Sequence, residues 1–263
     1  MRLYWEVARR SFRRYATYRW ATFAGAFTNS MFGLVRAYVL IAAHREKPQV
    51  GTFDVGDSVT FAFVSQGMIM AISLFALAGI AERVRTGDVV SDLYRPVDFQ
   101  AYHLSADLGR ALYHVVFRGL PPIIVGAIVF DLRMPPDLSA VVLFAASLLL
   151  AVCVGFAMRF CVDLTSFWLL DSTGAFQIWL ALTAFLAGLA VPLQFLPDAI
   201  EGPVRLMPWA SMIQLPIEIF LGHRRGLDAL GVLALQASWA IVLLGVGRVM
   251  LRAADRKLVI QGG

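Results

Sequence analysis

The sequence has few charged residues and almost no lysine. Only 16% of its 263 residues are charged, and Lys47 and Lys257 are its only lysines. Neither lysine follows a glycine-rich loop, so the phosphate-binding motif G-x-x-x-x-G-K-[ST] is missing and the chain itself cannot hydrolyse ATP by the P-loop route. Its two cysteines, Cys153 and Cys161, are too few for a disulfide framework or a zinc cluster.

Signatures of catalysis are also missing. The four histidines form no H-E-x-x-H motif, which argues against a zinc metalloprotease. The absence of G-x-S-x-G weakens the case for a serine hydrolase, and no nucleophile and base stand at a readable spacing. We therefore expect no catalytic residue, no metal site and no cofactor in this chain.

Apolar residues are abundant instead. They make up 59% of the chain, whose mean hydropathy is +0.70, whereas a soluble domain is about 45–50% apolar. Long apolar runs separated by short charged ones predict an all-α integral membrane protein. The six predicted membrane-spanning segments are Trp20–Ala43, Ser58–Ala81, Ala111–Phe130, Leu138–Phe160, Ser172–Val191 and Asp228–Leu251. Pro121 and Pro122 predict a kink or an early break in the third.

The distribution of basic residues predicts the orientation of these segments. Outside them, thirteen Lys and Arg residues lie on one side, and six lie on the other. The positive-inside rule places the richer side, with both termini, in the cytoplasm. Six crossings agree with this placement because an even number returns the chain to its starting side. No internal repeat or linker is visible, so residues 1–263 are expected to form a single transmembrane domain.

Three segments outside the spans carry further information. Residues 1–19 place arginines on one arc of a helical wheel and aromatic residues on the opposite arc. This pattern predicts an amphipathic helix lying in the membrane interface, and the alternative is a basic anchor that only sets topology.

The second segment is the cytoplasmic loop from Glu82 to Arg110. Asp88 can cap a short helix, and Pro96 ends it. On that helix an apolar face is formed by Val89, Val90, Leu93 and Tyr94. Either a soluble protein docks on this face from the cytoplasm, or the face packs on the cytoplasmic ends of the spans.

The third segment is rich in proline and lies on the outer side, between the fifth and sixth spans. Its five prolines prevent one straight helix and predict short re-entrant helices. These helices could line or plug the exit of a pathway, or only fill space.

Few ionisable residues lie in the predicted spans. Arg36 and then Arg118 are the candidates for a functional role, although both could extend toward the membrane surface. Asp163 and Asp171 are expected in the connection after the fourth span. The lack of a transmembrane chain of carboxylates argues against a proton-coupled secondary transporter.

The same segments resemble the membrane subunit of type-2 ATP-binding-cassette (ABC) exporters. The resemblance covers essentially the whole chain and rests on the arginine-rich N-terminal helix, on the loop Ile80–Asp88 with Leu93–Val97, and on Gly188–Pro197 with Met207–Trp209. The loop is similar to the family pattern "Ile…Arg-x-Gly-acidic…Leu-x-Arg-Pro-Val". The chain looks most like a compact bacterial six-span subgroup linked to drug or viologen export.

The resemblance implies roles by position. Residues 1–19 would be the connecting, or elbow, helix, residues 82–95 the coupling helix that seats on an ATPase, and residues 192–222 the re-entrant helices that close the outer mouth. The implied coupling residues are Glu82, Arg83, Arg85, Gly87, Asp88, Val89, Asp92, Leu93, Tyr94 and Arg95. The candidates for the substrate pathway are Arg36, Phe176, Trp179 and Phe185, and those for the outer gate are Pro192, Phe195, Pro197 and Pro208.

The resemblance also implies partners. Two copies of an ABC ATPase subunit would carry ATP and Mg, and a second permease, identical or paralogous, would face this one across the substrate path. Membrane lipid is expected as a partner, and nucleic acid is not. The expected location is the bacterial inner membrane, with export as the direction of transport. The alternative is a non-transporting membrane scaffold or assembly factor. The apolar path would suit a lipophilic cation, a peptide or a lipid equally.

Overall fold

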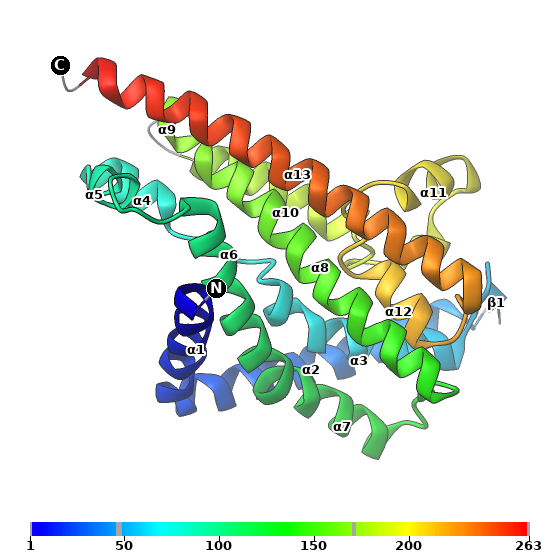
Figure 1. Cartoon of the computed structure of the whole chain (residues 1–263). Coiled ribbons are helices and arrows are strands. Elements are labelled where there is room, and N and C mark those ends of the chain that lie inside the picture. Colours follow the sequence, from blue (N-terminus) through cyan, green and yellow to red (C-terminus); the bar gives the residue numbers. More distant parts are fainter. Residues whose placement is uncertain (1, 46–48, 170–171, 262–263) are drawn as a thin grey trace.

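Helices make up 78% of the computed structural model, which describes residues 2–45, 49–169 and 172–261. Figure 1 shows the longest helices side by side, with shorter elements at the two ends. The long helices are α2 (Arg19–Ala43), α3 (Val55–Ile72), α6 (Phe99–His114), α8 (Leu138–Leu164) and α13 (Gly226–Gln261). A π-helical turn, η1 (Val115–Gly119), joins α6 to α7 (Leu120–Val129).

The shorter elements complete the chain. They are α1 (Arg2–Thr17), α4 (Ile80–Thr86), α5 (Val89–Leu93), α9 (Ser166–Leu169), α10 (Thr173–Leu186), the 3-10 turn η2 (Leu193–Phe195), α11 (Asp198–Arg205) and α12 (Gln214–Phe220). A two-stranded antiparallel ribbon of β1 (Gln49–Val50) and β2 (Phe53–Asp54) lies between α2 and α3.

The prediction of an all-α membrane protein is confirmed. Among the described residues, five helical segments are long and apolar enough to cross a membrane: 19–43, 55–72, 99–129, 138–169 and 226–256. The predicted fifth span is represented by α10, an apolar helix of 14 residues. At 1.5 Å per residue α10 is about 21 Å long, shorter than a hydrocarbon core of about 30 Å. Whether α10 crosses the membrane, which would bring the number of crossings to six, therefore stays a prediction.

The predicted end of the second span is wrong. α3 ends at Ile72, not at Ala81, because Ser73 adopts the left-handed conformation (φ 62°) that closes a helix. Apolar composition continues through residues 74–81, which is why hydropathy alone extended the span.

The third span begins earlier than predicted and does not break at its prolines. Asp98 caps α6 by accepting a hydrogen bond from the N–H of Ala101 at 2.7 Å, so most of the predicted loop before Arg110 is helical. The π turn η1 stands directly before Pro121 and Pro122, whose nitrogens cannot donate to the preceding turn. The irregular turn relieves that mismatch, and the helix continues to Val129.

α3 is the most buried of the long apolar helices. Of its residues 83% are buried within the protein, against 22% for the apolar stretch of α13. α3 packs on α2, α6, η1, α7 and α8. Gly67 and Gly119 allow the close approach of α3 to η1, because a Cβ at Gly67 would lie 2.7 Å from the Gly119 carbonyl oxygen. The core is therefore built around α3, with α8 and α13 paired beside it.

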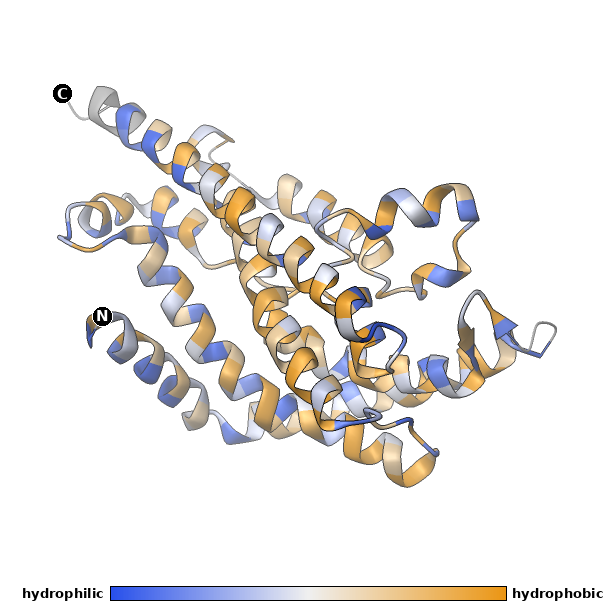
Figure 2. Ribbon diagram, turned by 45° about the vertical axis from the view of Figure 1, so that its right-hand side comes forward, coloured by the Kyte–Doolittle hydropathy of each residue, from blue (hydrophilic) through white to orange (hydrophobic). Residues whose placement is uncertain are grey.

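The outer faces of the long helices are apolar. Trp20, Phe23, Phe27 and Tyr38 on α2 are each more than half exposed. Figure 2 shows hydrophobic residues along the middle of the long helices and hydrophilic ones gathered mainly near the two ends and on α1. Soluble proteins rarely expose apolar patches of this extent, whereas the hydrocarbon core of a membrane accommodates them.

The short elements define two ends of the molecule. At one end lie α1, α4, α5, α9 and the last turns of α13, and at the other lie β1, α11 and α12 (Figure 1). We call these the α4–α5 end and the α11–α12 end. α1 packs along α6 through Phe12 and Tyr15, whose rings contact Tyr113, while its arginines are exposed. Phe12 and Tyr15 of the aromatic arc thus face α6 and the arginines face the surroundings, whereas Trp5 and Tyr18 are exposed.

Candidate functional site

The segment between α3 and α6 folds as two short helices rather than one helix over residues 82–95. α4 ends at Gly87, which adopts a left-handed conformation (φ 80°) and donates its N–H to the Val84 carbonyl at 3.2 Å. Glycine reaches this conformation without the penalty that a Cβ imposes. α5 then begins at Val89, and the two helices form one bent unit, the α4–α5 segment (residues 80–95).

The α4–α5 segment is attached to α8 by a buried carboxylate. Asp163 accepts hydrogen bonds from the backbone N–H groups of Ile80 at 3.0 Å and Ala81 at 2.9 Å. The first N–H groups of a helix have no partner within it, and this side chain supplies one. The expectation that Asp163 lies in the connection after the fourth span is wrong, because α8 runs to Leu164 and Asp163 is fully buried within it. Asp171 lies outside the described residues.

The predicted apolar face of α5 is divided between the interior and the surface. Val89 is 1% exposed and packs with Leu93 against a cluster that includes Phe156 and Phe160 of α8. Val90 is 40% exposed and Tyr94 is 81% exposed. Half of the face thus covers the protein's own helices, and the other half is available for a partner.

Charged side chains surround this exposed half. Glu82 and Arg85 form an ion pair at 2.7 Å on the surface of α4. Asp92 contacts Arg83 and pairs with Arg95 at 3.3 Å. Asp88 stands at the start of α5 but does not cap it with its side chain, which instead accepts a hydrogen bond from Thr86 Oγ1 at 3.0 Å.

A second set of buried charges lies between α6 and α8. Asp107 pairs with Arg110 at 2.9 Å and with Arg159 at 2.9 Å. Arg110 also donates to the Ala71 carbonyl at the end of α3, at 2.8 Å. This cluster was not predicted from the sequence. Arg159, within an apolar run, was the signal that could have revealed it, because an ionisable residue in a span needs a partner.

At the α11–α12 end, Glu218 holds the short helices together. This buried carboxylate of α12 accepts hydrogen bonds from Gln214 at 2.8 Å and Gln194 at 3.1 Å and pairs with Arg205 and Arg224. Burial lowers the pKa of the Arg205 guanidinium, but Glu218 and Glu201 raise it more, so the pKa lies above its usual value and Arg205 stays charged. η2, α11 and α12 are thereby fixed to one another.

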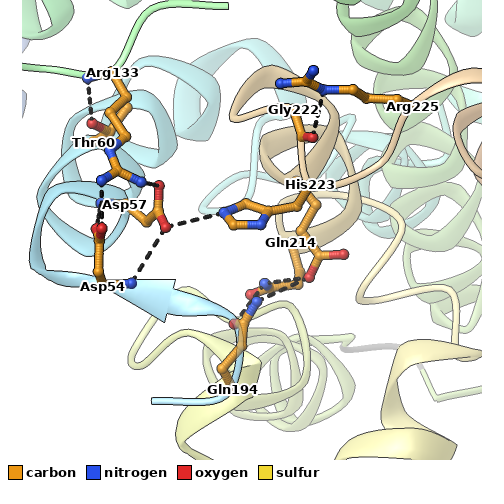
Figure 3. Close-up of polar contacts among 10 residues, drawn as sticks. Asp54, Asp57, Thr60, Arg133, Gln194, Gln214, Gly222, His223 and Arg225 are labelled. Carbon is orange, nitrogen blue, oxygen red and sulfur yellow. Dashed lines mark hydrogen bonds and ion pairs between the residues drawn. The ribbon is translucent and has the colours of Figure 1, made fainter. Parts of the chain in front are cut away.

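An adjacent cluster connects these helices to α3. Figure 3 shows His223, directly after α12, pointing toward Asp57 of α3, with Arg133 on the other side of that carboxylate. His223 Nε2 lies 3.1 Å from Asp57, and Arg133 lies 2.7 Å from it and also contacts Asp54. The His223 ring stacks on Phe53. The segment before α13 is therefore tied to the start of α3.

The predicted gate residues occupy different positions in this region. Pro192 and Pro208 are buried, Pro197 begins α11, and Phe195 contacts the ring of His44. Pro192, Pro197 and Pro208 thus lie before or between the short elements, whereas Pro203 lies inside α11 and Pro216 inside α12. The polar contacts come from residues to which no role was assigned from the sequence. Glu218 within the apolar stretch Gln214–Phe220 was the available signal.

The predicted pathway residues do not form one group. Phe176 and Trp179 stack on each other (ring centroids 5.7 Å apart), and Trp179 is in the core. Phe185 is 65% exposed on the outer face of α10. Arg36 belongs to the contact between α2 and α3, where it donates to Ser65 Oγ at 2.8 Å.

In residues 2–45, 49–169 and 172–261, no three His, Cys, Asp or Glu side chains gather into a group that could hold a metal ion. Comparison with known proteins gives one match to a family, described as "ABC-2 family transporter protein", over residues 33–262. No curated protein matches the chain. No solved structure matches it either.

Proposed function

Because the chain belongs to the ABC-2 family of transporters and is the membrane-spanning subunit of such a transporter, we propose that its α4–α5 segment couples it to separate ATPase subunits. The observation that carries the proposal is the exposed half of the α5 face. Val90 and Tyr94 project from a segment that is itself anchored to α8. A partner could push on such a segment and move the spans with it.

The charges around this surface favour a protein partner. The surface ion pair of Glu82 with Arg85 and the pair of Asp92 with Arg95 present both signs around an apolar centre. Protein interfaces commonly have an apolar core inside a polar rim. Two ATPase subunits would bind ATP and Mg, and this chain would convert their closure into movement of its helices.

The α11–α12 end supports a role in closing the outer mouth. α11 and α12 are too short to cross the membrane, and the contacts of Glu218 and His223 hold them over the start of α3. We place the α4–α5 end in the cytoplasm and the α11–α12 end outside, in the bacterial inner membrane, and we propose export as the direction of transport. Pro192, Phe195, Pro197 and Pro208 shape this outer gate.

The exposed face of α10 favours the presence of a second permease across the substrate path. Gln177 is exposed on this mainly apolar helix, together with Ile178, Leu182 and Phe185. A polar side chain facing lipid is costly, so it favours a water-filled path or a protein neighbour. We propose that α10 faces the second permease, identical or paralogous, and that Phe176, Trp179, Phe185 and Arg36 belong to the subunit's path region.

Purification in mild detergent from the native host tests the coupling proposal. An ATPase should accompany the wild-type chain, and Val90→Ser with Tyr94→Ser should release it. Tyr18→Ser is the matched control, because Tyr18 is also exposed but lies between α1 and α2. Release of the ATPase by Tyr18→Ser alone would overturn the assignment of the surface. A wild-type chain that carries no ATPase would favour a scaffold or assembly factor.

A further inference from the structure

The connection between α3 and α4 is bent at both ends. Ser73 adopts a left-handed conformation at its start (φ 62°), and Gly79 does so at its end (φ 82°). Between them, residues 76–78 form neither helix nor strand. A backbone of this kind changes direction twice and transmits axial force poorly compared with a continuous helix. The covalent connection from α3 to the α4–α5 segment is therefore flexible and transmits movement poorly.

Both ends of this connection are held by side chains from other helices. At the α3 end, Arg110 of α6 donates to the Ala71 carbonyl at 2.8 Å. At the α4 end, Asp163 of α8 receives the N–H groups of Ile80 and Ala81, one on each carboxylate oxygen. Each contact uses a helix terminus whose backbone groups lack partners within that helix.

The two contacts belong to one chain of buried charges. Arg110 pairs with Asp107, which pairs with Arg159, and both distances are 2.9 Å. Arg159 precedes Asp163 by one helical turn on α8 and is 1% exposed. Residues four apart share a face of a helix, so a single face of α8 holds both α6 and the N-terminus of α4.

Apolar packing also joins the α4–α5 segment to α8 and not to α3. Ile80 and Val89 are buried with Phe156, Phe160 and Leu164 of α8. No residue of α3 belongs to this cluster. Within the part of the chain that the structure describes, the segment is thus seated on α8 and on α9, which directly follows α8, with Ala254 of α13 in the same cluster. Its neighbour in sequence, α3, is reached through the bent connection.

We propose that Asp163 is a positioning residue that makes α8, rather than α3, the helix that receives the movement of the α4–α5 segment. The inference rests on the proposed coupling to an ATPase. Asp163 holds the first turn of α4 through two hydrogen bonds, so α4 and α8 move as one body. The pairing of Arg159 with Asp107 joins this body to α6, whose Arg110 contacts the end of α3, and residues 73–79 act as the hinge between α3 and α4.

Distance measurements between spin labels test this assignment in the complex of the permease with its ATPase, in lipid nanodiscs. With Cys153 and Cys161 replaced by alanine, one label pair joins Thr86 of α4 to Leu149 of α8, and another joins Thr86 to Phe32 of α2, which packs on α3. On trapping with ATP and vanadate, the first distance should stay constant and the second should shift. In Asp163→Leu the ATPase should stay bound, the first distance should change, and the shift of the second should be lost.

Two further variants make the outcome decisive. Asp163→Asn keeps one acceptor oxygen and should retain part of the shift of the second distance. This variant replaces Asp163→Leu in the test if Asp163→Leu fails to assemble. Asp255→Leu removes an exposed carboxylate from α13 and should behave as wild type. An Asp163→Leu complex with both distances as in wild type would overturn the role of Asp163 alone. A wild-type chain that binds no ATPase would overturn the proposed function, and this inference with it.

Discussion

Gly109 of α6 lies directly against the backbone of Ala8 on α1: a Cβ at Gly109 would be 2.0 Å from the Ala8 carbonyl oxygen. The obstacle is backbone rather than a flexible side chain, so Gly109→Ala must push α1 away from α6. Overpacking of this kind typically costs about 1–3 kcal/mol. We expect faster proteolysis of the first 17 residues and a lower unfolding temperature.

Gly245→Ala is the control for this prediction. No atom lies within 4 Å of the position that a Cβ would take at Gly245 on α13, and alanine favours a helix over glycine by about 1 kcal/mol. The control should therefore be neutral or slightly stabilising. Equal proteolysis of α1 in wild type and Gly109→Ala would mean that the contact is not made in the membrane.

Long apolar runs predicted most of the long helices because lipid and core impose a continuous apolar pattern on them. α2, α8 and α13 begin within two residues of their predicted starts. The end of α3 was missed because its cause is a backbone conformation at Ser73 and not a change in hydropathy. The extra turns of α13 were missed because charged residues continue a helix beyond its apolar part.

The contacts of the candidate site were less predictable because they join residues far apart in the chain. Asp163 meets Ile80, and Asp57 meets His223, only once the helices are packed. The charged rim of the α4–α5 segment was visible because its partners lie within nine residues of one another. Contacts between residues close together in the chain can be predicted from one sequence. When the partner of a buried carboxylate lies on a different helix, it cannot be identified from one sequence.

Removal of the Glu218 charge should loosen the α11–α12 end. Glu218→Leu leaves Gln194, Gln214 and Arg224 without their shared acceptor, while Arg205 keeps Glu201 at 2.8 Å. Breaking a buried ion pair costs about 3–5 kcal/mol, and the remaining partner of Arg205 places this change near the lower value. Hydrogen exchange should rise across residues 192–222.

The control for Glu218→Leu is Asp198→Leu, which removes an exposed carboxylate from α11. The hydrogen-exchange rate of residues 192–222 should stay as in wild type in this control. If both variants exchange equally fast, the hydrogen bonds of Glu218 do not hold the short helices.

Swapping the charges of Glu82 and Arg85 on α4 should uncouple the ATPase without unfolding the α4–α5 segment. In Glu82→Arg with Arg85→Glu the surface ion pair can re-form, so the fold should persist, with a change of at most about 1 kcal/mol. A partner that reads these charges would meet the wrong sign at each position. We expect loss of permease-dependent ATPase activity with an unchanged unfolding temperature. Full activity of the swapped variant would show that the partner does not contact these two residues.

Gln177 should be accessible to water in the assembled transporter. In a background without Cys153 and Cys161, Gln177→Cys should react with a membrane-impermeant maleimide, because the reagent needs a hydrated thiolate. Val249→Cys on α13 is also exposed in the isolated chain but should face lipid and stay unlabelled. Labelling of Val249→Cys in place of Gln177→Cys would put the path beside α13 instead of α10.

The most direct test of the central claim is photo-crosslinking from position 94 in native membranes. A photoreactive amino acid in place of the exposed Tyr94 should form an adduct with a nucleotide-binding subunit, and the same group in place of Phe195 at the opposite end should form none. A Tyr94→Cys variant that reacts with a membrane-impermeant reagent added outside intact cells would contradict the account.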